Sequence, residues 1–263
     1  MPLLNAAIVT HSPILIPEIG KINRNLLTKT VEAYTELATQ LQGNDIETII
    51  IISPHGTIQN NRFTVNVGPE LTIDLSNFGY LGVGRKFTSD LHLIDEIKKF
   101  SGPEIQLISQ EKMDYGCSVP LHLLTNNMPD VKIVAISYAK DLSLEDHWTL
   151  GEHINKVIAN SAKRIAIIAS GDLSHHLKKN SPSGYSPKGT KFDNKLIEYL
   201  NDPANVQKNI FNMDTKLIKD AGECGLKSIV ILLGALKNLN YKPKMLAYQT
   251  ELGIGYLTMD FKL

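Results

Sequence analysis

The chain has 263 residues, enough for one large domain or two small ones and enough to bury a substantial core unaided. Lys plus Arg and Asp plus Glu both number 27, so no net charge attracts nucleic acid or an anionic membrane. The two cysteines, Cys117 and Cys224, are too few for a disulfide framework. With no targeting peptide and no membrane-length apolar run in sight, the sequence predicts a soluble, cytoplasmic protein.

Apolar runs alternate with helical periodicities along the chain. In chain order, the patterns predict a strand at 3–10, a helix at 25–42, a strand at 47–53, a hairpin at 62–75, a helix at 89–100, strands at 104–109 and 131–137, a helix at 142–161, a strand at 164–170, helices near 190–200, 203–211 and 224–239, and strands at 244–250 and 255–261. Strands that are apolar on both faces are typical of parallel sheets covered on both sides. We therefore expect a single α/β domain over residues 1–263, with a central, mainly parallel or mixed sheet, helices on both faces and antiparallel hairpin additions.

The segment 178–190, KKNSPSGYSPKGT, is the one linker-like stretch. Its Pro, Ser, Gly and Lys content suits a surface loop better than a domain boundary, because strands and helices resume after it. Since the loop directly follows His175 and His176, we expect it to form a flap over a functional site.

Three of the predicted strands end in the same way, with a histidine close behind them. The strand at 3–10 is followed by His11, the strand at 47–53 by His55, and the strand at 164–170 by His175 and His176. Ligands of open α/β sheets bind beyond the carboxyl ends of the strands. If the three strands are parallel neighbours, His11, His55 and His175 converge there. The other histidines, at positions 92, 122, 147 and 153, fall in helical patterns, and we expect 92, 147 and 153 on helix surfaces.

Two histidines and one carboxylate, with open positions left over, suit non-haem Fe(II). The segment 220–239 offers Glu223 as the carboxylate, directly after Gly222 and before an apolar helix. An ordinary acidic residue at a helix N-terminus fits the same pattern, and on spacing alone it is the better interpretation. Asp114-Tyr115-Gly116 predicts a turn that leads into a further helix.

The motifs THSP, SPHG, DYG with VPL, GDLSH, and AGECG with LLGAL occur in this order over residues 11–234. In this set the chain resembles the class III extradiol ring-cleavage dioxygenases of the LigB-like superfamily, and especially its small prokaryotic members grouped with the Memo-like proteins. The resemblance implies a single α/β domain that inserts O₂ into a catechol-like ring.

The resemblance also assigns roles to single residues. It implies that His11, His55 and Glu223 bind Fe(II), and that His175 is the catalytic acid and base. Tyr115 stands where family members often have a histidine associated with substrate binding or proton transfer. A cysteine of a similar CG segment lines the equivalent pocket in Memo-like proteins, and Cys224 matches it.

Three functions therefore remain open. The leading one is an Fe(II)-dependent extradiol-type dioxygenase whose partners are a small aromatic substrate and O₂. A Memo-like protein that binds a metal or a peptide without ring cleavage is the second, and a zinc hydrolase that uses the same His/His/Glu site is the third. We expect no nucleic-acid or membrane partner, and the sequence leaves open whether the chain forms a homo-oligomer.

Overall fold

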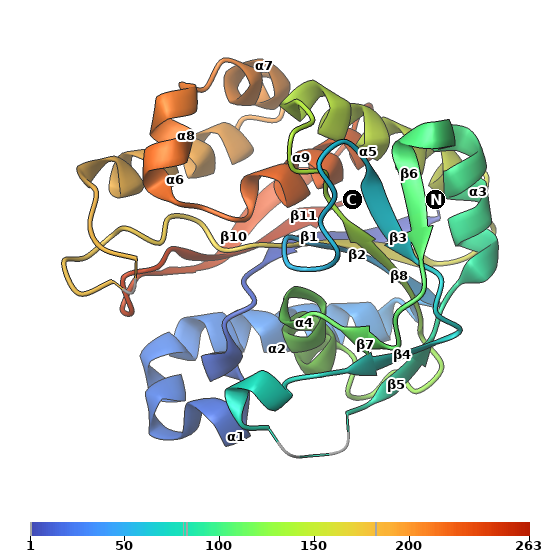
Figure 1. Cartoon of the computed structure of the whole chain (residues 1–263), viewed down its shortest axis with the longest axis horizontal. Coiled ribbons are helices and arrows are strands. Elements are labelled where there is room, and N and C mark those ends of the chain that lie inside the picture. Colours follow the sequence, from blue (N-terminus) through green and yellow to red (C-terminus); the bar gives the residue numbers. More distant parts are fainter. Residues whose placement is uncertain (1, 81, 83, 182) are drawn as a thin grey trace.

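The structure is a computed structural model that describes residues 2–80, 82, 84–181 and 183–263. Its centre is an eight-stranded sheet with the strand order β10-β11-β1-β9-β2-β8-β3-β6 (Figure 1). The strands are β1 (Leu3–Val9), β2 (Thr48–Ser53), β3 (Phe63–Asn66), β6 (Ile105–Ile108), β8 (Lys132–Ser137), β9 (Ile165–Ser170), β10 (Lys242–Gln249) and β11 (Tyr256–Lys262).

The middle of this sheet is parallel and its flanks are mixed. Strands β1, β9, β2 and β8 run parallel to one another, whereas β11 pairs antiparallel with β1 and β10, and β3 pairs antiparallel with β8. The predicted fold class, a mixed α/β sheet covered by helices on both faces, is confirmed. The four parallel strands place their carboxyl ends at one edge of the sheet.

Helices cover both faces of the sheet, and the sheet separates the hydrophobic core into two layers (Figure 1). One layer contains α3 (Leu91–Ser101), α5 (Leu144–Ala159), α6 (Pro187–Leu200), α7 (Val206–Phe211), α8 (Thr215–Ala221) and α9 (Leu226–Ala235). The other contains α2 (Thr28–Gly43) and α4 (Tyr115–Leu124), next to a small sheet of β5 (Lys86–Thr88), β4 (Glu70–Ile73) and β7 (Lys112–Met113). The short α1 (Pro17–Gly20) lies before α2.

Strand β2 shows why the sequence forms a sheet with two covered faces. Ile50 and Ile52 pack into the first layer and Ile49 and Ile51 into the second, and all four are fully buried. Each buried isoleucine contributes roughly 1.5–3 kcal/mol relative to an exposed one. The run of β-branched residues therefore stabilises a strand with no solvent face.

The prediction of a hairpin at 62–75 is wrong, because the two strands of this segment belong to different sheets. Strand β3 lies in the large sheet between β8 and β6, whereas β4 pairs with β5 and β7 in the small sheet. The side chain of Asn66 explains the change of sheet. Its Oδ1 accepts hydrogen bonds from the backbone N–H groups of Gly68 and Gln110, and its Nδ2 donates to the Gln110 carbonyl, so the link after β3 is tied to the segment after β6.

The loop after β9 stays on the same edge of the molecule as His175. The N–H of Leu177 donates to Gly253 O, the Ser181 hydroxyl donates to the same carbonyl, and Lys178 Nζ donates to Glu251 O. The described part of 178–190 thus packs on the turn between β10 and β11, and its action as a flap stays a prediction.

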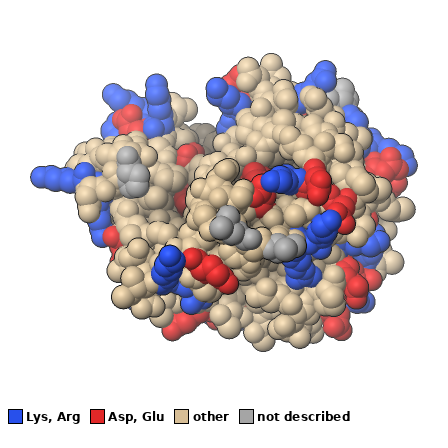
Figure 2. Space-filling model, turned by 60° about the horizontal axis from the view of Figure 1, so that its bottom comes forward, with Lys and Arg blue, Asp and Glu red and all other residues tan. Residues whose placement is uncertain are grey.

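The surface shows a mixture of charges, and the lengths and apolar character of the helices bear on whether the chain crosses a membrane. On the face in Figure 2, basic and acidic side chains lie interspersed. Among the residues that the structure describes, no helix combines the length and the apolar character needed to cross a membrane.

Candidate metal centre

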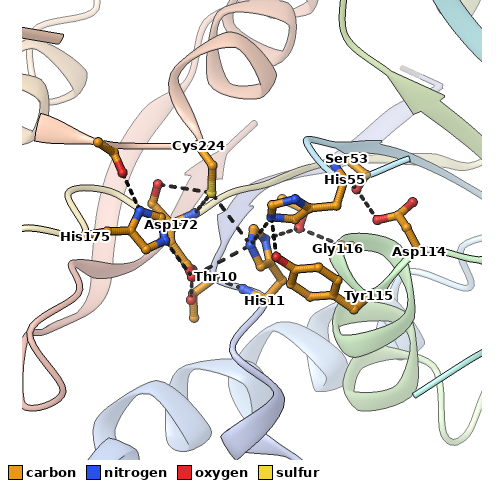
Figure 3. A network of polar contacts seen from close by, with 12 residues as sticks. Thr10, His11, Ser53, His55, Asp114, Tyr115, Gly116, Asp172, His175 and Cys224 are labelled. Carbon is orange, nitrogen blue, oxygen red and sulfur yellow. Dashed lines mark hydrogen bonds and ion pairs between the residues drawn. The ribbon is translucent and has the colours of Figure 1, made fainter. Parts of the chain in front are cut away.

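Three neighbouring parallel strands deliver the histidines to one place. In the register of the sheet, Val9 lies opposite Ser170 and Ile52 lies opposite Ala169, so β1, β9 and β2 end almost level. His11 and His55 follow two of these ends directly. Their Nε2 atoms lie 3.1 Å apart and their rings meet edge to face (Figure 3).

Cys224 completes this group. Its Sγ lies 3.7 Å from His11 Nε2, and the ligand atoms of His11, His55 and Cys224 all lie within 4.8 Å of one another. At most one proton can lie between the two imidazole nitrogens. At least one of these nitrogens therefore has a lone pair with no proton to accept. Two imidazole nitrogens and a thiol at these distances can bind one zinc or transition-metal ion.

The hydrogen bonds of His11 fix which of its nitrogens faces the group. The Ser170 hydroxyl donates its proton to Gly116 O at 2.6 Å, so it accepts a hydrogen bond from His11 Nδ1–H at 3.0 Å. Nε2 of His11 then carries a lone pair. Such a partner on the second ring nitrogen is the usual orienting contact of a metal-binding histidine.

Burial keeps both imidazoles neutral. It lowers the pKa of His11, although Asp172 and Asp114 act in the opposite direction. Burial also lowers the pKa of His55, to about 4, and the proximity of His11 adds to this shift. Near neutral pH both rings are therefore available as metal ligands without losing a proton first.

A close approach of two backbones positions Cys224. A Cβ on Gly171 would lie 2.2 Å from the Cα of Gly225, so side chains are excluded from this contact between the end of β9 and the start of α9. The N–H groups of Cys224 and Gly225 both donate to the Asp172 carbonyl, at 3.2 and 3.1 Å. These bonds hold the thiol beside the strand ends.

The structure does not bring Glu223 into the group. Its Oε2 accepts a hydrogen bond from the Leu226 N–H at 2.6 Å, as an acid at the N-terminus of α9 does. Burial raises the pKa of Glu223 to about 7, and the hydrogen bond from the Leu226 N–H and the charge of Lys227 partly offset this shift. Cys224, the next residue, contributes its thiol to the group, and a metal-binding role of Glu223 stays a prediction.

His175 lies beside the group without belonging to it. Its Nδ1–H donates to Gly222 O at 2.5 Å, so in the neutral ring the lone pair lies on Nε2. That Nε2 lies 3.9 Å from Asp172 Oδ2, and the same oxygen lies 3.7 Å from His11 Nε2 (Figure 3). Asp172 is a site residue that the sequence analysis missed, although the GDLSH motif contains it. Its other oxygen accepts from the Thr10 hydroxyl.

Tyr115 closes the site on the side of α4. Its hydroxyl lies 2.8 Å from His55 Nε2, and its ring stacks on the imidazole of His55 with centroids 4.3 Å apart. Burial and nearby acids raise the pKa of Tyr115 above its usual range, so the hydroxyl stays neutral. It can donate a hydrogen bond in the site but cannot exchange a proton at ordinary pH.

A separate cavity of about 410 Å³ lies at the opposite end of the sheet, where β2, β8 and β9 begin. Acidic and basic side chains line it, including Glu47, Lys132 and Arg164. None of the three residues His11, His55 and Cys224, called the metal group below, lies among its lining residues. This cavity is therefore separate from the candidate metal centre.

Several known proteins are similar in sequence to this chain over most of its length. "Protein CA_C1420" of Clostridium acetobutylicum is 32% identical over 281 residues, covering 100% of the chain, while the chain spans only 58% of that protein's length. A 3,4-dihydroxyphenylacetate 2,3-dioxygenase of Escherichia coli is 24% identical, with 73% of the chain and 74% of the enzyme covered. The MEMO1 family protein MJ0403 of Methanocaldococcus jannaschii is also 24% identical, with 87% and 73% covered.

A solved structure and a family profile agree with these matches. The uncharacterized protein JW3007 of Escherichia coli K12 superposes with a TM-score of 0.69 at 15% identity, covering 98% of this chain and 99% of that one, which shows a shared fold. The profile described as "Catalytic LigB subunit of aromatic ring-opening dioxygenase" matches residues 5–258. The chain belongs to the LigB family.

Proposed function

We propose that this protein is a metal-dependent dioxygenase that opens a catechol-like aromatic ring with O₂. Fe(II) is held by His11, His55 and Cys224, and His175 is the acid and base. The observation that carries the proposal is the convergence of two neutral imidazole nitrogens and a thiol beside a histidine whose own lone pair lies outside the group. The family profile and the dioxygenase relative support the reaction class.

In this proposal Fe(II) would bring the catechol and O₂ together and activate both. The protein supplies geometry and proton transfer. Nε2 of His175 takes a proton from a substrate hydroxyl, and Asp172, 3.9 Å away, stabilises the imidazolium that forms. The Tyr115 hydroxyl, which stays neutral, donates a hydrogen bond to a substrate oxygen.

The identity of the third ligand is tested with two adjacent substitutions. We expect Cys224→Ser to lose most of its bound metal, because the weaker oxygen donor replaces a thiolate. Glu223→Gln should keep the metal, because a neutral amide oxygen can still accept the Leu226 N–H bond. Metal content is measured on anaerobically prepared protein. Loss of metal in Glu223→Gln with retention in Cys224→Ser would restore the carboxylate as the ligand.

A second candidate function follows from the thiol itself. A His/His/Cys set is softer than two histidines with a carboxylate and also suits zinc or copper. A metal-binding protein without ring-opening activity, or a zinc hydrolase, would use the same residues, and the MEMO1 family relative favours the first of these. Oxygen consumption by the iron-loaded protein with a panel of catechols separates them, because only the dioxygenase consumes O₂.

A further inference from the structure

The end of β2 and the start of α4 share one carboxylate oxygen. Oδ1 of Asp114 accepts a hydrogen bond from the hydroxyl of Ser53, the last residue of β2, at 2.5 Å (Figure 3). The same oxygen accepts the Cys117 N–H at 3.2 Å, because Asp114 is the N-cap of α4. Capping the helix needs only the second of these bonds. The first one joins the helix to the strand that leads into His55.

The Ser53 hydroxyl also contacts the backbone of His55. Its Oγ accepts the His55 N–H at 3.2 Å while it donates its own proton to Asp114. A hydroxyl has one proton and two lone pairs, so both bonds form together. Ser53 is fully buried, and loss of the Asp114 carboxylate would leave its proton without this acceptor. The backbone at His55 therefore depends on where Asp114 holds the serine hydroxyl.

The first turn of α4 contacts β2 and β9 at Gly116. A Cβ on Gly116 would lie 2.4 Å from Ser53 Oγ, so the close approach of strand and helix leaves no room for a side chain. The Gly116 carbonyl accepts the Ser170 hydroxyl at 2.6 Å, and Ser170 Oγ lies 3.0 Å from His11 Nδ1. This turn is therefore linked to both histidines of the metal group, to His55 through Ser53 and to His11 through Ser170.

Tyr115 begins α4 directly after its cap, and it meets His55 in two ways. Its hydroxyl lies 2.8 Å from His55 Nε2, and the two rings stack with centroids 4.3 Å apart and an angle of 18° between their planes. A movement of α4 away from β2 would change both contacts. The bond between Ser53 and Asp114 lies at the junction that prevents this movement.

We propose that Asp114 is a positioning residue for the metal centre, because it joins β2 to α4 and so fixes the imidazole of His55 relative to Tyr115 and His11. The inference rests on the proposed function, since it concerns the same metal ligands. It assigns the effect to the hydrogen bonds of Asp114 and not to its charge. Loss of a partner that orients a metal-binding histidine typically lowers metal affinity by about 10–100-fold.

Metal affinity is the first test, with Co(II) as the probe. Ser53→Ala removes the bond to β2 and leaves the cap of α4 in place. We expect Ser53→Ala and Asp114→Ala to bind Co(II) about 10–100-fold more weakly than the parent protein and to change the visible spectrum of the bound ion. Asp114→Asn should bind like the parent, because its amide oxygen can accept both bonds. Anaerobic competition with a chromophoric chelator measures the affinities.

Ser137→Ala is the matched control. Ser137 ends β8, lies opposite Ser53 in the register of the two strands and is also buried, but its strand leads to Tyr138 and not to a proposed ligand. It should bind Co(II) like the parent protein. Parent-like affinity in Ser53→Ala, or an Asp114→Asn variant as weak as Asp114→Ala, would overturn the inference and leave the proposed function standing.

The second test needs no metal. The imidazole of His55 lies against the face of the Tyr115 ring, so the NMR chemical shifts of its ring protons include a ring-current contribution. In metal-free Ser53→Ala we expect these signals, assigned with His55→Gln, to lose part of that contribution, whereas Asp114→Asn and Ser137→Ala should keep it. Unchanged signals in Ser53→Ala would overturn the inference. If the signals move but the parent protein binds no Co(II), the proposed function falls and the positioning of His55 by Asp114 stands.

Discussion

His175 and His176 are neighbours in the chain that both bind the C-terminal end of α8. The Nδ1 atoms of His175 and His176 contact the carbonyls of Gly222 and Asp220, and the Ser174 hydroxyl donates to Ala221 O. The carbonyls that a helix leaves unpaired at its end thus orient the two imidazoles. Only His175 also approaches Asp172 and the metal group.

Substituting each of these histidines separates acid–base chemistry from structure. We expect His175→Ala to keep its metal and to lose turnover by a factor of about 10²–10⁴, the usual contribution of a general acid or base. His176→Ala removes an equivalent carbonyl contact and should lower turnover far less. Metal content and oxygen consumption are measured for both variants. If His175→Ala loses its metal as completely as His11→Ala does, His175 is a ligand and the acid–base role is wrong.

Asp193 is a fully buried carboxylate behind the site. Its Oδ1 accepts from the Ser174 N–H at 2.9 Å and its Oδ2 accepts from the Tyr248 hydroxyl at 2.7 Å. Burial raises the pKa of Asp193 to about 6, while these two hydrogen bonds act in the opposite direction. A carboxyl group whose pKa rises on folding binds its proton more tightly in the folded chain. Its contribution to stability is therefore present at low pH and is lost as the pH rises through about 6.

Asp193→Asn should remove this pH dependence. An amide can accept the Ser174 N–H bond and donate to the Tyr248 oxygen, and it does not titrate. Between pH 4 and pH 7 we expect the free energy of unfolding of Asp193→Asn to gain up to about 3 kcal/mol relative to that of the parent protein, from a shift of about two pKa units. Urea unfolding at both pH values measures it. Tyr248→Phe, which keeps the carboxyl group, is the control, and parallel pH profiles of parent and Asp193→Asn would contradict the assignment.

The contact between the end of β9 and the start of α9 positions the thiol of Cys224. Gly171 and Gly225 touch there with no room for a side chain. We expect Gly171→Ala to cost about 1–3 kcal/mol of stability through overpacking and to weaken metal binding, because α9 must move away from β9 and carry Cys224 with it.

Gly43→Ala is the matched control for this contact. A Cβ at Gly43, at the end of α2, would meet nothing within 4 Å. Its thermal stability and metal content should stay close to those of the parent protein. A Gly171→Ala variant that binds metal as tightly as the parent would show that the approach of the two glycines does not position the thiol.

The sequence predicts the strands and the strand-end histidines well, because continuous apolar runs and parallel topology determine both. It cannot choose between Glu223 and Cys224, since adjacent residues in a turn point in different directions and a contact with distant Gly171 decides which one faces the site. The prediction that His147 lies on a helix surface is wrong. His147 is fully buried, and its two ring nitrogens face the carbonyls of Ser143 and Ala139.

For the whole molecule, a metal that binds only the folded chain must raise its stability. The free energy gained is RT ln(1 + [metal]/Kd), about 2.7 kcal/mol at a hundredfold excess over Kd. We expect a chelator to lower the melting temperature of the metal-loaded protein and to leave that of Cys224→Ser nearly unchanged. Differential scanning calorimetry with and without chelator checks this. Equal shifts in the two proteins would mean that the stabilising metal binds elsewhere.

The residues of the metal group lie far apart in the sequence, so the ribosome makes them at different times. His11 and Cys224 are 213 residues apart, and the first is translated long before the second. At about 5–20 residues per second, a ribosome takes roughly ten to forty seconds to cover that distance. During this interval His11 and His55 can meet, but their third partner does not yet exist. A metal held by all three residues, as proposed, could therefore be bound only after Cys224 is made, when the four parallel strands β1, β2, β8 and β9 have already been translated and β10 and β11 have not.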